Sequence, residues 1–187
     1  TQAMARAARA LGARVRRNER VIGLRQHKNY EWTVTSLAAG VETEIECEIV
    51  INAAGYRAGE VMDLIGRHLP IMTMAHQYLI TEEIDELAAR TEPLPLLRDP
   101  DTSYYLRQER SGFILGPYEW QATPMWLDGI PDQFANMLWS EDLERLEKQI
   151  LDAGERVPVL GEAGIAKVVN GPIPYAPDGN PYLGPER

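Results

Sequence analysis

The sequence predicts a mixed α+β (α/β) fold, in which an α/β unit is joined to a mostly antiparallel sheet with flanking helices. Residues 48–55 run from consecutive Val and Ile into Ala-Ala-Gly, which is typical of a strand buried on both faces of an α/β sheet. Residues 70–81 alternate between two side-chain faces, and residues 103–119 contain two such runs around a turn. The change of pattern predicts a boundary near residue 67, which gives domains over 1–66 and 67–170 and a final segment over 171–187.

Composition argues against several classes of protein. Acidic residues outnumber basic ones by 28 to 19, and the resulting net charge of −9 argues against a general nucleic-acid binder. No run approaches the ~18 apolar residues of a membrane span, so we expect no membrane partner. Cys47 is the only cysteine, and the histidines lack the spacing of metal ligands. We therefore expect no disulfide within the chain, no metal site and a reducing compartment.

The first 66 residues are expected to form a helix followed by short strands. Apolar residues recur at helical spacing up to Leu11, and Gly12 is a natural helix stop. Two alternating, β-rich runs on either side of the polar turn 27–29 predict a hairpin. The Arg-rich start also suits a transit peptide, but it contains no Ser, so we favour a folded segment. The expected elements are helices over 1–11 and 58–65 and strands over 13–17, 21–25, 30–35, 42–47 and 48–55.

The remaining residues are expected to form the antiparallel sheet. The two alternating runs around the Arg110-Ser111-Gly112 turn predict a hairpin. Ser140 is a good N-cap before an apolar stripe at helical spacing, and Gly154 is a suitable stop. The expected elements are strands over 70–81, 103–109, 112–119 and 166–170, helices over 82–90 and 140–154, and a turn over 175–179.

Two positions in this sheet are candidates for chemistry. His76 lies in mid-strand among apolar neighbours, where an imidazole must find a hydrogen-bond partner and where its pKa is ordinarily near neutrality. From the residues alone, a satisfied core histidine and an active-site histidine both remain open. Tyr104 and Tyr105 point to opposite faces of their strand, so at most one of them enters a given pocket.

Several motifs, taken in order, resemble one family. They are Asn52-Ala53-Ala54-Gly55, Met74-Ala75-His76-Gln77-Tyr78, the run from Leu97-Arg98-Asp99 through Tyr104 to Glu119, and the segment from Asn170 to Gly179. Together these motifs resemble the DAO-type FAD-dependent oxidoreductases, which include glycine oxidase and sarcosine oxidase-like enzymes. Within this group they look most like the dimethylglycine and sarcosine dehydrogenases. The resemblance implies that 1–66 is the second half of an FAD-binding domain, 67–170 a substrate-binding domain and 171–187 a segment that returns to the FAD domain.

The resemblance also implies roles for individual residues. His76 and Tyr105 match residues on the substrate side of the flavin, with Tyr104 as the alternative to Tyr105. The substrate class is then a small N-methylated glycine such as dimethylglycine or sarcosine, oxidised by hydride transfer to FAD. The positions that match FAD contacts are Val21, Ala53, Ala54, Gly55, Pro177, Asp178 and Gly179.

The sequence also departs from the family pattern. Tyr56 and Arg57 stand where the family commonly has an aromatic residue, often Trp, soon after Asn-Ala-Ala-Gly. No Gly-x-Gly-x-x-Gly follows a strand, so the turn that binds the cofactor phosphates is absent. The family's flavin-linking histidine also lies upstream of the matched segment. We therefore expect an internal piece of a larger enzyme, whose main partner is the remainder of the same chain.

Other readings of the function remain open. The regulatory subunit of pyruvate dehydrogenase phosphatase shares this architecture without amine oxidation, and related oxidases act on other amines or amino acids. Tetrahydrofolate use would depend on a further domain that often follows in the family. We expect a bacterial cytoplasmic location, or the mitochondrial matrix if the source is a eukaryote.

Overall fold

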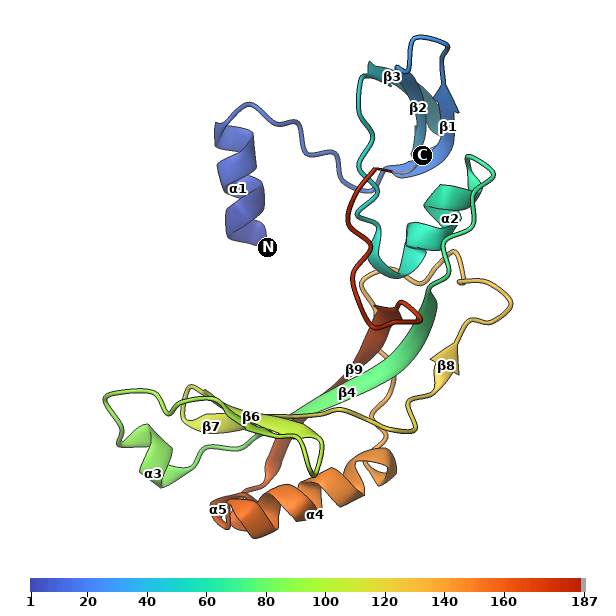
Figure 1. The fold of residues 1–187 in the computed structure, drawn as a ribbon. Coiled ribbons are helices and arrows are strands. Elements are labelled where there is room, and N and C mark those ends of the chain that lie inside the picture. The colour runs from blue at the N-terminus through green and yellow to red at the C-terminus, as the bar shows by residue number, and fades with distance from the viewer. Residues whose placement is uncertain (186–187) are drawn as a thin grey trace. The chain divides into compact units, whose positions relative to one another are not determined.

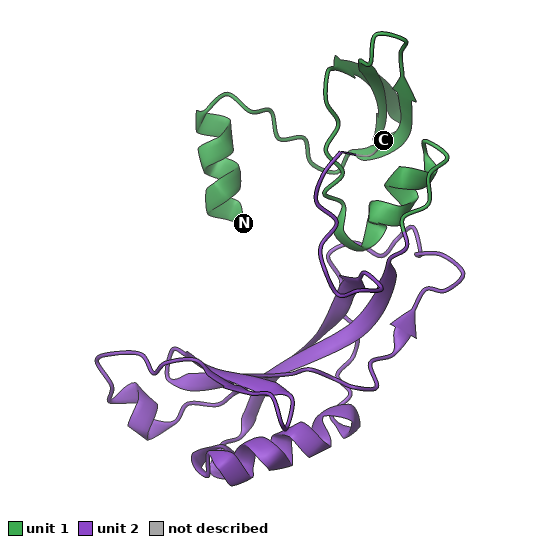
Figure 2. Cartoon of the chain, viewed as in Figure 1, with its two compact units in different colours: residues 1–69 green, residues 70–187 purple. Residues whose placement is uncertain are grey.

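The computed structural model describes residues 1–185 and divides the chain into two compact units, Thr1–Leu69 and Pro70–Arg187 (Figure 2). The last two residues of the expected 171–187 segment lie outside the described range. Helices and antiparallel sheets are both present, so the prediction of a mixed α+β fold is confirmed.

The first unit contains a three-stranded antiparallel sheet in the order β1-β2-β3 (Figure 1). The β2–β3 turn contains Gly40 at φ 81°, a left-handed backbone conformation that glycine adopts without steric cost. The strands β1 and β2 form the expected hairpin. The elements are α1 (Gln2–Ala10), β1 (Arg20–Gln26), β2 (Trp32–Ala38), β3 (Val41–Cys47), the 3₁₀ helix η1 (Gly55–Arg57) and α2 (Ala58–Asp63).

The expected strand over 48–55 is not formed, and this prediction was wrong. Among the described residues no strand pairs with this segment, and Ile49 and Ile51 are 76% and 84% exposed. A strand of consecutive β-branched residues is stable only when neighbouring strands and helices cover both of its faces. The described chain supplies no such neighbours to this segment. The expected strand over 13–17 is likewise irregular.

The second unit is built on a six-stranded antiparallel sheet around the long strand β4 (Met72–Thr81). The strand β9 (Ile165–Tyr175) pairs along the whole of β4, so β7 and β8 must share the other edge of β4. The helices lie on one side of this sheet (Figure 1). The other elements are α3 (Asp85–Ala88), β5 (Leu97–Asp99), β6 (Tyr104–Glu109), β7 (Gly112–Pro117), β8 (Pro124–Met125), η2 (Glu144–Leu146), α4 (Glu147–Arg156) and α5 (Val159–Glu162).

The core of the second unit lies between the sheet and these helices. A row of apolar side chains crosses five strands by direct pairing, and α3 and α4 pack against the same face through Leu87 and Ala153. Burying such a row removes apolar surface from water at about 25 cal/mol per Å². The opposite face of the sheet is therefore the one left available for a ligand. The row consists of Leu97, Leu106, Leu115, Leu79 and Val168.

Two boundaries differ from the sequence prediction for physical reasons. The helix expected from Ser140 begins only at Glu144, because the backbone of Ser140 and Asp142 is already bonded to side chains of the sheet. The strand expected to stop at Asn170 continues to Tyr175, although it contains Pro172 and Pro174. An edge strand tolerates proline where the position of the missing N–H faces away from the ladder.

Candidate functional site

His76 lies on the face of β4 that is turned away from the helices. Along β4, the side chains of Thr73, Ala75, Gln77 and Leu79 are buried, while those between them are partly exposed. This alternation follows directly from the two-residue period of a strand. His76 and Tyr78 therefore share the partly exposed face.

Tyr105 lies on the same face of the sheet as His76. It pairs with Gly116 on β7, and Ile114, two residues before Gly116, pairs with Ile80 of β4. Directly paired residues of an antiparallel sheet share a face, so Tyr105 belongs to the face that carries Ile80 and, by alternation, His76. Tyr104 points the other way and is fully buried in the core.

Gly116 explains how the Tyr105 ring lies flat on the sheet. A Cβ atom at Gly116 would lie 2.1 Å from Cζ of Tyr105, which is less than any real contact. The ring thus occupies the space that a side chain at position 116 would fill. The ring centroid of Tyr105 is 5.9 Å from that of Tyr118, and the guanidinium of Arg98 lies 5.0 Å from the Tyr118 centroid. Burial, followed by the nearby Tyr118, raises the pKa of Tyr105, so its hydroxyl is a hydrogen-bond donor at neutral pH.

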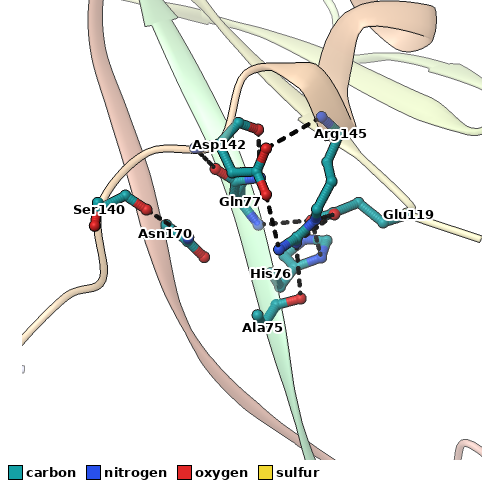
Figure 3. A network of polar contacts seen from close by, with 8 residues as sticks. All are labelled: Ala75, His76, Gln77, Glu119, Ser140, Asp142, Arg145 and Asn170. Atoms are coloured by element: carbon teal, nitrogen blue, oxygen red, sulfur yellow. Dashed lines mark hydrogen bonds and ion pairs between the residues drawn. The ribbon is translucent and has the colours of Figure 1, made fainter. Parts of the chain in front are cut away.

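A gap in the sheet lies beside His76. On the β7 and β8 edge of β4, pairing with β8 ends at Met74 and pairing with β7 begins at Leu79. The N–H of Ala75 still donates to the carbonyl of Thr123 at 2.8 Å, and the rest of the gap is closed by side chains, as Figure 3 shows. Glu119 Oε1 accepts a hydrogen bond from the backbone N–H of Gln77 at 3.0 Å, and Nη2 of Arg145 donates to the carbonyl of Ala75 at 3.3 Å.

The two residues that close the gap also bind each other. Nε of Arg145 donates to Oε2 of Glu119 at 2.9 Å, and the Glu119 side chain is only 3% exposed. Nδ1 of His76 lies 3.7 Å from Oε1 of Glu119, which is an electrostatic contact rather than a hydrogen bond. Sequence reasoning assigned no role to Glu119 or Arg145. No local signal marked either residue, because a charged residue between Leu143 and Leu146 is the ordinary pattern of an amphipathic helix.

The environment of His76 favours the neutral imidazole. Burial lowers the pKa of His76 below 6.5, Glu119 opposes this shift, and Arg145 adds to it. The side chain remains 14% exposed on the open face. At neutral pH the ring therefore carries a free lone pair, which can accept a hydrogen bond or a proton.

The Asn52-Ala53-Ala54-Gly55 motif forms a turn that its own asparagine holds. Oδ1 of Asn52 accepts from the N–H of Ala54 at 3.3 Å, and Nδ2 of Asn52 donates to the carbonyl of Ala58 at 2.9 Å. Gly55 has φ 59°, and a Cβ there would meet nothing within 4 Å. The turn therefore needs glycine for its conformation and leaves backbone open to a ligand.

The other positions expected to contact a cofactor lie on separate elements. Val21 is on β1, is 39% exposed and sits at a bulge in the register with β2. Pro177, Asp178 and Gly179 form an exposed turn, closed by a bond of 3.0 Å from the N–H of Gly179 to the carbonyl of Ala176. Hydrogen bonds from Asn180 lower the pKa of Asp178. The structure thus brings His76 and Tyr105 onto one face, while these positions are divided between the two units.

The described residues add two observations about the kind of site. No helix among residues 1–185 is both long enough and apolar enough to cross a membrane. The same residues contain no group of three or more His, Cys, Asp or Glu side chains arranged to hold a metal ion.

This fold and this arrangement of motifs define a class of flavoprotein. The chain belongs to the FAD dependent oxidoreductase (DAO) family, whose pattern matches residues 1–187. The resemblance that the motifs indicated is therefore confirmed. The chain is 40% identical to human mitochondrial dimethylglycine dehydrogenase over 192 residues, which cover 100% of this chain and 22% of that protein. It is 37% identical to human mitochondrial sarcosine dehydrogenase over 187 residues, which cover 97% of this chain and 19% of that protein.

A solved structure supports the same fold. The L-proline dehydrogenase of P. horikoshii superposes with a TM-score of 0.75 at 24% identity, over 100% of this chain and 46% of that one. The chain thus spans about a fifth of the length of its curated dehydrogenase relatives.

Proposed function

We propose that this chain forms the substrate-binding part, and a portion of the cofactor-binding part, of an enzyme that oxidises an N-methylated glycine. The two dehydrogenase relatives are named for dimethylglycine and sarcosine, which supports this substrate class. The observation that carries the proposal is the placement of His76 and Tyr105 on one face of one sheet, opposite the helix-covered core.

His76 acts on the amine of the substrate. A protonated amine has no lone pair to stabilise the cation that is left when a neighbouring C–H bond loses hydride. A neutral imidazole at this position accepts the amine proton or a hydrogen bond from it, and so keeps the nitrogen uncharged. The lowered pKa of His76 supports this role, because the ring is already deprotonated at neutral pH.

Tyr105 orients the carboxylate of the substrate. Its raised pKa keeps the phenol protonated, and a phenol O–H donates well to a carboxylate oxygen. Gly116 allows the ring to lie on the sheet with Tyr118 beside it, which limits the positions that the hydroxyl can take. Bound FAD would supply the hydride acceptor for the reaction.

The positions that would hold FAD fit a ligand that approaches backbone closely. Gly55 and Gly179 both have positive φ, and a Cβ at either position would meet nothing within 4 Å. We assign cofactor contacts to these turns, through Ala53, Ala54, Gly55, Pro177, Asp178 and Gly179, and to the backbone of Val21. We further propose that the remainder of a longer chain completes the FAD site, that a folate domain is an optional addition, and that a eukaryotic source implies the mitochondrial matrix.

The test measures flavin reduction in the full-length protein. Under anaerobic conditions, we expect dimethylglycine or sarcosine to bleach the flavin absorbance. His76→Asn should slow the reduction by about 10²–10⁴-fold, as expected when a general base is lost. Tyr105→Phe should weaken substrate binding by roughly tenfold to a hundredfold, because a hydrogen bond to a charged group is lost.

Tyr104→Phe is the matched control. It removes the same atom from the neighbouring residue, whose buried hydroxyl has no hydrogen-bond partner among the described residues. This variant should reduce flavin at the wild-type rate. Flavin that stays oxidised with every N-methylated glycine tested would contradict the proposed substrate class. Reduction of the flavin by other amino acids would show that the substrate is one of those instead.

A further inference from the structure

The backbone on both sides of His76 is held by one ion pair. Glu119 accepts from the N–H of Gln77, and Arg145 donates to the carbonyl of Ala75, so the residues before and after His76 are each fixed by one member of the pair (Figure 3). In an ordinary sheet these backbone groups would bond to a neighbouring strand. Here the neighbouring strand ends after the bond from the N–H of Ala75 to the carbonyl of Thr123, and two charged side chains take its place up to Leu79.

The pair is itself anchored to the rest of the second unit. Nε2 of Gln77 donates to the carbonyl of Asp142 at 3.0 Å, and the N–H of Asp142 donates back to Oε1 of Gln77 at 2.8 Å. Asp142 also lies beside Arg145, with its Oδ2 atom 3.8 Å from Nη1. The segment that begins the helix is thereby locked to the strand that carries His76.

We propose that Glu119 and Arg145 are positioning residues for His76, which fix its backbone and set the charge around its ring. This inference rests on the proposed function of His76 and adds residues to which the sequence analysis gave no role. Replacing a strand by an ion pair leaves a carboxylate 3.7 Å from the imidazole, whereas a strand would have offered only neutral peptide groups. The break in the sheet thus allows the charged Glu119 carboxylate to lie close to the His76 imidazole.

The charges around His76 act in opposite directions. Glu119 raises the pKa of His76 and Arg145 lowers it, while burial remains the larger influence. Asp142 lies next to Arg145, and on β9 the residue paired with His76 is Gly171, which has no charge. The pair therefore contributes a nearly neutral unit, and removal of either member should expose the charge of the other.

This opposition separates a positioning role from a purely structural one. If the pair only closed the sheet, loss of either member would loosen the same backbone and affect His76 in the same way. If the pair sets the charge around the ring, Glu119→Gln should lower the midpoint of the His76 titration and Arg145→Gln should raise it. Gln at position 119 keeps one acceptor oxygen, which can still accept from the N–H of Gln77 and so keep the sheet closed there, while its NH₂ group cannot accept from Arg145.

The experiment follows deuterium exchange at the imidazole Cε1 position by peptide mass spectrometry across a pH series. A peptide that contains His76 without His68 reports on this ring alone, and the measurement does not require turnover. It is carried out on the full-length protein, with the rate of flavin reduction measured on the same samples. Arg145→Lys retains the positive charge and should restore a titration close to that of the wild type.

Lys148→Gln is the control for the loss of a positive charge. Lys148 lies three residues after Arg145, is 63% exposed and pairs with Asp152 at the surface. It should leave the titration of His76 unchanged. Midpoints that move in the same direction in Glu119→Gln and Arg145→Gln, or that move no further than in Lys148→Gln, would overturn the inference.

The two proposals fail separately. Opposite shifts of the His76 midpoint support the positioning role even if no N-methylated glycine bleaches the flavin, in which case only the proposed substrate class is lost. Bleaching without opposite shifts leaves the proposed function in place and removes the role of the pair.

Discussion

At the scale of the residue, the burial of His76 links its protonation to stability. Because burial lowers the pKa of the folded-state imidazole below 6.5, the unfolded chain binds a proton more readily than the folded chain as the pH falls. The contribution of the neutral, buried imidazole to the free energy of unfolding is fully present above pH 6.5. It is lost as the pH drops from there towards the lower folded-state pKa. His76→Gln removes this titration.

We therefore expect the stability difference between wild type and His76→Gln to depend on pH. Urea unfolding above and below pH 6.5 should show that the wild type loses part of its advantage on the acid side. His68→Gln, which replaces an exposed histidine of the first unit, controls for the loss of a histidine as such. A difference between wild type and His76→Gln that stays constant with pH would contradict this prediction.

At the scale of the element, the packing of β6 on β7 depends on Gly116. Gly116→Ala should force the Tyr105 ring off the sheet, because the new Cβ would lie 2.1 Å from Cζ of that ring. Overpacking of this kind costs about 1–3 kcal/mol, and substrate affinity should fall together with stability.

Gly161→Ala is the matched control for Gly116→Ala. It adds the same methyl group in α5, where a Cβ would meet nothing within 4 Å, and should be neutral or slightly stabilising. Urea unfolding measures the stability of both variants, and substrate titration measures their affinity. Equal stability of the two variants would mean that the Tyr105 ring moves aside without cost.

The elements that the sequence predicted correctly are those with local signals. The β6–β7 hairpin has a turn between two alternating runs, and β4 alternates along its whole length, so neither depends on distant residues for recognition. The prediction of a strand over 48–55 was wrong because such an apolar run forms a strand only when a larger sheet surrounds it. The delayed start of the helix after Ser140 and the extension of β9 depend on contacts with β4, which no local pattern contains.

The residues proposed for the site came from two kinds of signal. His76 stood out because an imidazole in the middle of an apolar strand must find a hydrogen-bond partner, whereas Tyr105 was preferred to Tyr104 only through the resemblance to the family. The pairing of Glu119 with Arg145 was not predictable, since it joins positions on separate elements across a break in strand pairing. A gap in a sheet leaves no periodic trace in the sequence, because it is defined by where neighbouring strands diverge.

At the scale of the whole molecule, we expect that the 187 residues do not retain FAD by themselves. The turns at Gly55 and Gly179 offer open backbone, but the sequence contains no Gly-x-Gly-x-x-Gly segment to bind the phosphates at a helix N-terminus. Phosphate contacts of this kind combine several N–H donors with the helix dipole, and isolated turns do not replace them.

We therefore expect these residues, purified and incubated with FAD, to lose the flavin on desalting and to show no turnover with N-methylated glycines. Visible absorbance per mole of protein is the measurement, and the full-length protein treated in the same way is the positive control. A stoichiometric yellow product from the 187 residues would contradict the prediction. It would also mean that phosphate binding adds little to the retention of the cofactor.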